Sequence, residues 1–153
     1  QGGALLEGVL NLGRAAVASE MTGLSEEAFS RTVTYLKERK QFGKLIGEFQ
    51  ALQHRMADML LHQEQARSMS YLAAMQCTNP DQALRQRTLS AAKVTIGQAC
   101  RFVAQNAVQL HGGMGMTEEL AIGHYFKRLT ALQYEFGSTD FHLSRYAGIT
   151  RPN

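Results

Sequence analysis

The sequence predicts a nearly all-α fold, an up-and-down antiparallel four-helix bundle with a short extra C-terminal helix. The first observation is composition: 44% of the 153 residues are hydrophobic, and there are only two prolines and no tryptophan. Ala, Leu, Gln and Met are abundant, which favours helices over strands. The second observation is periodicity, because apolar residues recur at steps of three and four in long segments joined by short turns. Long helices with short connections predict an antiparallel bundle, and the length suits one domain.

The first helix is predicted from Ala4 to Lys37. Gly8, Gly13 and Gly23 weaken it locally, and glycines of this kind permit close packing between helices. The apolar residues that define its expected buried face follow helical spacing: Leu5, Val9, Leu12, Ala16, Leu24, Ala28 and Leu36.

A basic turn, Lys37 to Lys44, leads into the second helix. Its expected apolar stripe begins with Phe49, Leu52, Met56 and Leu60 and continues to Ala74. The segment Asn79-Pro80-Asp81 ends this helix, because proline cannot continue the hydrogen-bonding pattern.

The third helix has the most regular period, which predicts that it is central to the core. A fourth helix is expected from about Glu118 to Tyr134, and the turn from Phe136 to Thr139 separates it from a short final helix that starts at Asp140. The third helix's stripe is Leu89, Ala92, Ile96, Ala99, Val103, Ala107 and Leu110.

The segment from Gln109 to Glu119, QLHGGMGMTEE, places three glycines within four positions after the third helix. Backbone without side chains can approach a ligand closely, and its free N–H groups can cradle the anionic part of a nucleotide cofactor. A plain helix-to-helix turn with a glycine cap is the structural alternative.

Charge and composition argue against several classes of protein. The net charge is only +3, and basic residues are interleaved with acidic ones, so we expect no nucleic-acid partner. No apolar run is long enough for a membrane span or a signal peptide. Cys77 and Cys100 lie in apolar helical surroundings and are read as reduced, which indicates the cytoplasm. Because the chain opens Gln-Gly-Gly without a methionine, we interpret it as one domain of a longer protein.

No metal site is expected. A di-iron bundle needs two Glu-x-x-His pairs, which the sequence lacks. His54, Asp58 and His62 share one helical face at suitable spacing, but without ligands from a second helix they indicate a solvated polar face. His111 and His124 are interpreted as structural.

Several motifs together resemble the C-terminal helical domain of the flavin-dependent acyl-CoA dehydrogenases, and the resemblance covers essentially the whole chain. The motifs, in order, are ERKQFGK at 38–44, FQ at 49–50, ADM at 57–59, QLHGGMG at 109–115 and a Gly-Ser-Thr turn at 137–139. The resemblance implies an N-terminal helical domain and a middle β domain outside this chain. It also implies tetramers, either homomeric or heteromeric, an acyl-CoA substrate, and electron-transfer flavoprotein or a similar electron acceptor.

The resemblance also implies a role in FAD binding for seven residues. Arg39 is expected at the pyrophosphate and Phe42 against the adenine half of the FAD of a neighbouring subunit, and a guanidinium suits phosphate oxygens. Gln109 is expected to hold the adenosine portion together with Gly112 and Gly113 across the dimer interface. The remaining two, Ser138 and Thr139, occupy the turn that contacts the flavin end in the family.

The implied reaction removes the α proton of an acyl-CoA thioester with a base while hydride leaves the β carbon for the flavin, giving the trans-2-enoyl-CoA. In most of the family the base is a glutamate, but an ungapped count from Gln109 puts Phe136 at that position. A minority carries the base on the first long helix, and counting back from Arg39 puts Leu12 or Gly13 there. Both family positions therefore lack a carboxylate.

Three interpretations follow. Glu135 could act as a displaced base, with Arg14 steadying it or the substrate. The base could instead be Glu7 or lie in another domain, or the chain could be a catalytically silent, structural subunit of a heteromeric dehydrogenase. The backbone N–H of Phe136 could still bind the thioester carbonyl, because that contact needs no particular side chain.

Overall fold

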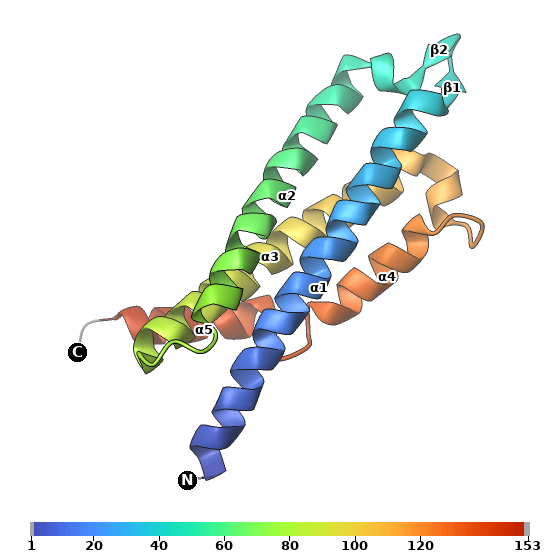
Figure 1. The fold of residues 1–153 in the computed structure, drawn as a ribbon. Helices are drawn as coiled ribbons and strands as arrows, with labels where there is room; N and C mark the ends of the chain where they lie inside the picture. Colours follow the sequence, from blue (N-terminus) through green and yellow to red (C-terminus); the bar gives the residue numbers. More distant parts are fainter. Residues whose placement is uncertain (1, 152–153) are drawn as a thin grey trace.

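The computed structural model describes residues 2–151, and most of these residues are helical. Figure 1 shows the order of the elements. They are α1 (Gly2–Glu38), β1 (Lys40–Gln41), β2 (Lys44–Leu45), the 3-10 helix η1 (Ile46–Glu48), α2 (Gln50–Gln76), α3 (Gln82–His111), the 3-10 helix η2 (Gly112–Met116), α4 (Ile122–Leu132) and α5 (Thr139–Thr150).

The first four α-helices alternate in direction, and α5 crosses the end of the bundle away from the β1–β2 hairpin (Figure 1). The two strands form a short antiparallel hairpin in which Lys40 pairs with Leu45. Helix α3 contacts α1, α2, α4 and α5. This arrangement confirms the predicted bundle with an extra C-terminal helix.

Helix α3 is the core of the molecule, as its periodicity predicted. Asp81 caps its first turn, because the Asp81 side chain accepts a hydrogen bond of 3.0 Å from the backbone N–H of Leu84. All seven residues of the predicted stripe are buried, and none is more than 7% exposed.

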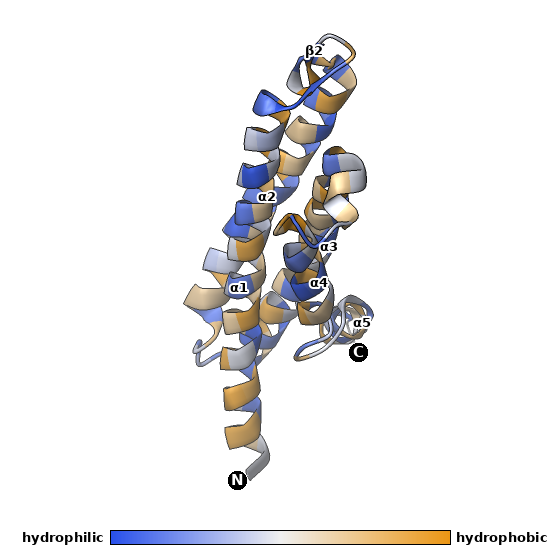
Figure 2. Ribbon diagram, turned by 90° about the vertical axis from the view of Figure 1, so that its right-hand side faces the viewer, coloured by the Kyte–Doolittle hydropathy of each residue, from blue (hydrophilic) through white to orange (hydrophobic). Residues whose placement is uncertain are grey.

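The predicted buried face of α1 is wrong in its first half. Leu5, Val9 and Leu12 are 74%, 64% and 52% exposed. The N-terminal turns of α1 extend past the other helices, and Figure 2 colours much of their ribbon as hydrophobic. Contacts with α2, α3 and α4 decide the buried face, and the residues that point inward there are Asn11, Arg14, Ala15, Val17, Ala18, Met21, Thr22 and Ser25.

Helices α2 and α4 also differ from their predicted patterns. Leu60 and Ala74 are exposed on α2. The α2 side chains that are buried instead are Met59, Gln63, Ala66, Ser70 and Ala73. Helix α4 begins only at Ile122, because residues 117–121 form bends and turns. Apart from Met59, the buried residues of α2 are small or polar, and Gln63 and Ser70 hydrogen-bond to α1. Hydropathy alone therefore misplaced that face.

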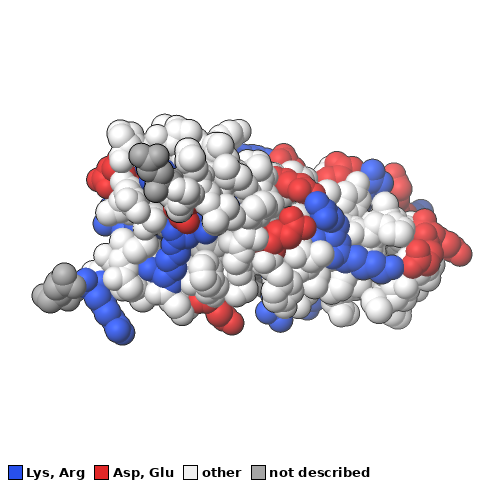
Figure 3. All heavy atoms as spheres, turned by 90° about the horizontal axis from the view of Figure 1, so that it is seen from below, with Lys and Arg blue, Asp and Glu red and all other residues white. Residues whose placement is uncertain are grey.

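Charged side chains of both signs lie next to one another on the face that Figure 3 shows. Cys77 and Cys100 are both free thiols, and Cys100 is buried. Within residues 2–151, no helix is both long and apolar enough to cross a membrane.

Candidate functional site

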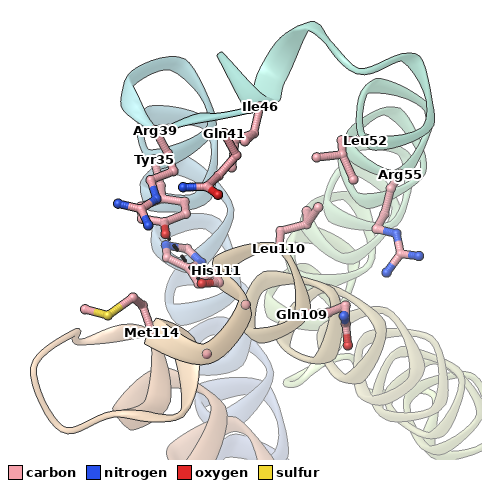
Figure 4. A pocket seen from close by; sticks show the side chains of 12 residues that line it. Tyr35, Arg39, Gln41, Ile46, Leu52, Arg55, Gln109, Leu110, His111 and Met114 are labelled. Atoms are coloured by element: carbon pink, nitrogen blue, oxygen red, sulfur yellow. Dashed lines mark hydrogen bonds between the residues drawn. The ribbon is translucent and has the colours of Figure 1, made fainter. Parts of the chain in front are cut away.

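A groove opens where the end of α1, the hairpin and the end of α3 come together. The hairpin turns back through Phe42 and Gly43, both with positive φ (54° and 81°), and α3 stops at Gly112, whose φ is 60°. The groove has a volume of about 580 Å³ (Figure 4). Its lining includes four of the predicted cofactor residues: Arg39, Gln109, Gly112 and Gly113.

The polar lining of this groove is cationic. Arg39 and Arg55 lie on opposite sides of it, at the end of α1 and on α2 (Figure 4). Gln41 and Gln109 add amide groups, and no carboxylate of residues 2–151 lines the groove. The Arg39 side chain makes no ion pair with any residue in the described range 2–151. Sequence reasoning missed Arg55, because a single arginine on a polar helix face carries no local signal.

The glycines that follow α3 have two different roles. A Cβ atom on Gly112 or Gly113 would meet nothing within 4 Å, so their backbone is uncovered on the groove side. A Cβ on Gly115 would lie 2.5 Å from the carbonyl oxygen of Val108. Gly115 is therefore required by packing, whereas Gly112 and Gly113 leave backbone accessible to a ligand.

His111 lies at the groove, where its ring makes two contacts with neighbouring residues. Its Nδ1 is 2.7 Å from the carbonyl oxygen of Ala107, and its ring stacks on Tyr35 with centroids 4.3 Å apart. Because a carbonyl only accepts, Nδ1 carries the proton and Nε2 is left as an acceptor. Burial lowers the pKa of His111 below its usual value, which favours this neutral form.

The other histidines in the sequence motifs form no metal cluster. His124 is exposed and lies 3.8 Å from Glu118. His62 packs against Phe102, while His54 and Asp58 are exposed. In the part of the chain that the structure describes, no group of three His, Cys, Asp or Glu side chains is placed to hold a metal.

Phe42 projects from the tip of the hairpin and does not line the groove. Its side chain is 91% exposed, and its only aromatic neighbour in the described residues is Phe49, at 6.2 Å between ring centroids. A ring so exposed has an apolar face free for contact with a ligand or with another chain.

Ser138 and Thr139 lie far from the groove, at the start of α5. The Ser138 hydroxyl accepts a 3.2 Å hydrogen bond from the Phe141 N–H and so caps α5. Both residues line a separate hollow of about 240 Å³ beside Gly97 and Arg101. Gly97, beside Ser138 and Thr139, and Gln109, beside the groove, are twelve residues apart on α3. The predicted cofactor residues at the groove and those at the start of α5 are therefore separated by about 18 Å along the helix.

The turn that precedes α5 is built over two buried basic groups that sequence reasoning missed. Lys93 donates from Nζ to the carbonyl oxygens of Glu135 (2.9 Å) and Leu132 (3.4 Å). Burial lowers the pKa of Lys93 to about 8. His142, which is fully buried, contacts the carbonyl oxygen of Phe136 through Nε2 at 2.9 Å, and burial lowers its pKa to about 4.

Arg14 is buried, but its partner is not Glu135. Its Nη1 donates to Glu7 Oε1 (2.9 Å) and to Asn11 Oδ1 (2.7 Å). Burial opposes ionisation of Glu7, yet hydrogen bonds from Arg145 and Arg14 hold the pKa of Glu7 below its usual value. The Glu135 carboxylate instead lies 3.6 Å from Arg128, and its side chain is 43% exposed.

Comparison with known proteins places this geometry in a family. Over 118 residues, covering 77% of this chain and 31% of the relative, the chain is 36% identical to the caffeyl-CoA reductase-Etf complex subunit CarC of Acetobacterium woodii. Over 140 residues it is 32% identical to the mitochondrial short/branched chain specific acyl-CoA dehydrogenase of Bos taurus, covering 92% of this chain and 32% of that protein. The chain thus spans about a third of the length of these curated relatives.

A solved structure gives the same result for the fold. Butyryl-CoA dehydrogenase from Megasphaera elsdenii superposes with a TM-score of 0.84 at 30% identity, covering 91% of this chain and 36% of that one. Residues 1–148 match the family described as "Acyl-CoA dehydrogenase, C-terminal domain". The chain therefore belongs to the acyl-CoA dehydrogenase family, as a C-terminal helical domain.

Proposed function

We propose that the full-length protein containing this chain is an FAD-dependent acyl-CoA dehydrogenase that oxidises an acyl-CoA thioester to the trans-2-enoyl-CoA. In this proposal residues 1–153 are the C-terminal domain, and a helical domain and a β domain precede it. The observation that carries the proposal is the cationic groove, in which a family member brings Arg39 and Gln109 together with the uncovered backbone of Gly112 and Gly113.

The groove fits the phosphate-bearing half of FAD. Arg39 and Arg55 offer guanidinium forks for pyrophosphate oxygens, and among the described residues no carboxylate lines the groove to repel the anion. Gln109 can hydrogen-bond a ribose or an adenine. Phe42, at the exposed tip of the hairpin, would cover the adenine half of the FAD of a neighbouring subunit.

Ser138 and Thr139 would hold the flavin end from beside the middle of α3, next to Gly97. Because the two sets of residues lie about 18 Å apart along the helix, we propose that one cofactor is shared between two subunits of a tetramer. When bound, FAD supplies the acceptor for the hydride that leaves the β carbon.

This chain's own contribution to the chemistry would lie at the Phe136 turn. The Phe136 N–H would donate to the thioester carbonyl, which makes the α proton more acidic. For the base we propose Glu135, brought to the substrate by a shifted last turn of α4, with Arg14 steadying the base or the substrate. Glu7 and a carboxylate from another domain are the alternatives.

A second function is favoured by one observation. The ring of Phe136, at the family's position for the base, lies against Gly13, which is one of the two residues, Leu12 or Gly13, that the count from Arg39 puts at the family's second position. An apolar contact is thus found where the family carries a base, and neither position holds a carboxylate. This supports the alternative that the chain is a catalytically silent subunit of a heteromeric acyl-CoA dehydrogenase.

We propose the cytoplasm as the location, since Cys77 and Cys100 are both free. We propose electron-transfer flavoprotein or a similar protein as the electron acceptor. The relative named as a subunit of an Etf complex supports this choice.

The test uses the purified full-length protein under anaerobic conditions. We expect a yellow protein whose flavin absorbance is bleached by at least one acyl-CoA among short, long, dicarboxylic and aromatic thioesters. A colourless protein would contradict the proposal. A yellow protein that no thioester bleaches would favour the silent subunit.

A further inference from the structure

The turn between α4 and α5 has its carbonyl oxygens directed inward onto buried donors. Lys93 Nζ donates to Leu132 and Glu135, and His142 Nε2 donates to Phe136. Lys93 is only 2% exposed and His142 is fully buried. These three hydrogen bonds hold the carbonyl groups of Leu132, Glu135 and Phe136 on the inner side of the chain in this structure.

This arrangement sets the direction of the Phe136 N–H. The peptide bond between Glu135 and Phe136 is trans, since residues 2–151 contain no cis peptide. In a trans peptide the C=O and the N–H point in opposite directions. Because the Glu135 carbonyl points at Lys93, the N–H of Phe136 points away from it.

The Phe136 N–H is also left without an acceptor. The N–H groups on either side, those of Glu135 and Gly137, donate to the carbonyls of Leu132 (3.2 Å) and Tyr134 (3.3 Å). The Phe136 N–H donates to no backbone or side-chain acceptor in the described part of the chain. Its φ of 56°, in the left-handed region, takes it out of the helical hydrogen-bonding pattern.

The buried ammonium group of Lys93 is unusual because no carboxylate is paired with it in residues 2–151. Its ammonium makes no ion pair within residues 2–151 and is hydrogen-bonded only to backbone carbonyls. Burying a cation without a paired carboxylate is costly. A cation on the carbonyl of a peptide also draws electrons from its N–H, which makes that N–H a stronger donor.

We propose that Lys93 is a positioning residue that directs and polarises the Phe136 N–H for the carbonyl oxygen of the acyl-CoA thioester. His142 holds the next carbonyl and keeps the turn in its left-handed conformation. This inference rests on the proposed function, because it concerns the same thioester.

The test measures the carbonyl stretch of a bound thioester, which reports hydrogen bonding directly and does not depend on turnover. The probes are crotonyl-CoA and cinnamoyl-CoA labelled with ¹³C at the thioester carbonyl, bound to the FAD-loaded full-length protein. The variants are Lys93→Met, which removes the charge at similar volume, and Lys93→Arg, which retains it. Lys127→Met is the matched control, because Lys127 is exposed and paired with Glu118.

In the parent protein we expect the labelled band at lower wavenumber than in water. In Lys93→Met most of this shift should be lost and the probe should bind about tenfold more weakly. Lys93→Arg should recover part of the shift, and Lys127→Met should match the parent. Retained FAD absorbance in each variant reports that the fold is intact.

Two results would overturn the inference, and they differ in what else they affect. If Lys93→Met binds the probe with the parent's band position, Lys93 does not position the amide, while the proposed function stands. If the parent protein shifts the band of neither probe, the proposed function fails and this inference fails with it.

Discussion

The ring of Phe136 packs directly on Gly13. An ideal Cβ atom added to Gly13 would lie 2.6 Å from Cε1 of Phe136 and 2.7 Å from Cζ, and real Cβ atoms essentially never come so close to a neighbouring atom. Phe136 is held in its position by a left-handed backbone and by the His142 contact to its carbonyl. The absence of a side chain at Gly13 is therefore what admits the ring against α1.

We expect Gly13→Ala to destabilise the chain despite the better helix propensity of alanine. Alanine gains up to about 1 kcal/mol in a helix, whereas overpacking costs about 1–3 kcal/mol, so a net loss of roughly 1 kcal/mol is expected. The measurement is urea unfolding of the 153-residue chain followed by circular dichroism.

Gly23→Ala is the control for this substitution, because a Cβ on Gly23 meets nothing within 4 Å. It should stabilise the chain. Adding Phe136→Ala to Gly13→Ala should remove the clash, so a double-mutant cycle should give a favourable coupling between the two sites. Strict additivity would show that the ring and Gly13 do not interact.

The Arg39 side chain should contribute to FAD binding and little to the fold. Arg39→Ala should weaken FAD retention by the full-length protein by about 1.5–3 kcal/mol, because one charge-assisted contact is lost. Lysine should restore this only in part, since it lacks the bidentate fork. FAD content after gel filtration is the measurement.

Arg31→Ala is the matched control for Arg39→Ala, because the Arg31 guanidinium is already paired with Glu27 at 2.8 Å. FAD retention should be unchanged in that variant. Equal FAD content in the Arg39→Ala protein and the parent would mean that Arg39 is only a cation at a helix end.

The helices and much of the groove could be predicted from local sequence, but the residues under the Phe136 turn could not. The α3 stripe repeats at helical spacing, and the motifs around Arg39 and Gln109 are contiguous in sequence. Lys93, by contrast, sits beside Ala92 in a helix and reads as a solvent-facing residue. Its burial follows only from the way α4 and α5 close over α3.

The prediction of the buried face of α1 was wrong for a related reason. Leu5, Val9 and Leu12 have helical spacing, but a helix with apolar residues on several sides does not reveal which side its neighbours cover. Buried Asn11 and Arg14 are satisfied in part by each other and by Glu7, so their polarity did not prevent burial. Contacts with the neighbouring helices determine which face of α1 is buried.

The buried His142 makes stability fall with acid. Its pKa is about 4 in the folded chain, lowered by burial and by the cations Arg14, Lys93 and Arg145, against an ordinary value of 6.5. Between these values the unfolded chain binds a proton that the folded chain does not. The free energy of unfolding therefore decreases as pH falls from 6.5 to 4, by on the order of 2–3 kcal/mol.

Urea unfolding of the 153-residue chain across this range measures the effect. His142→Gln removes the titration and keeps an N–H that can donate to the Phe136 carbonyl, so the decrease over this window should become shallower in that variant. The same slope in both proteins would assign the acid sensitivity to other groups, such as Glu7.

The identity of the base can be decided by two substitutions on adjacent residues. Glu135 precedes the family's position by one residue, which on a helix is a rotation of about 100°. Its carboxylate lies on the side of Arg128, so the last turn of α4 must shift before this group can come within about 3.2 Å of an α proton. If it does so, Glu135→Gln should lower the rate of flavin reduction by acyl-CoA at least about a hundredfold while FAD remains bound.

Phe136→Glu tests the opposite possibility, because it returns a carboxylate to the family's position opposite Gly13, where space exists for a side chain. We expect acyl-CoA to reduce the flavin of the parent protein and to reduce that of the Glu135→Gln variant slowly. The Glu135→Gln/Phe136→Glu double variant should recover part of the rate of flavin reduction. Anaerobic stopped-flow absorbance of the flavin measures all three rates.

An unchanged rate of flavin reduction in Glu135→Gln would move the base to Glu7 or to another domain. An inactive parent that gains activity with Phe136→Glu alone would identify the chain as the silent subunit, because its only missing component would then be the carboxylate.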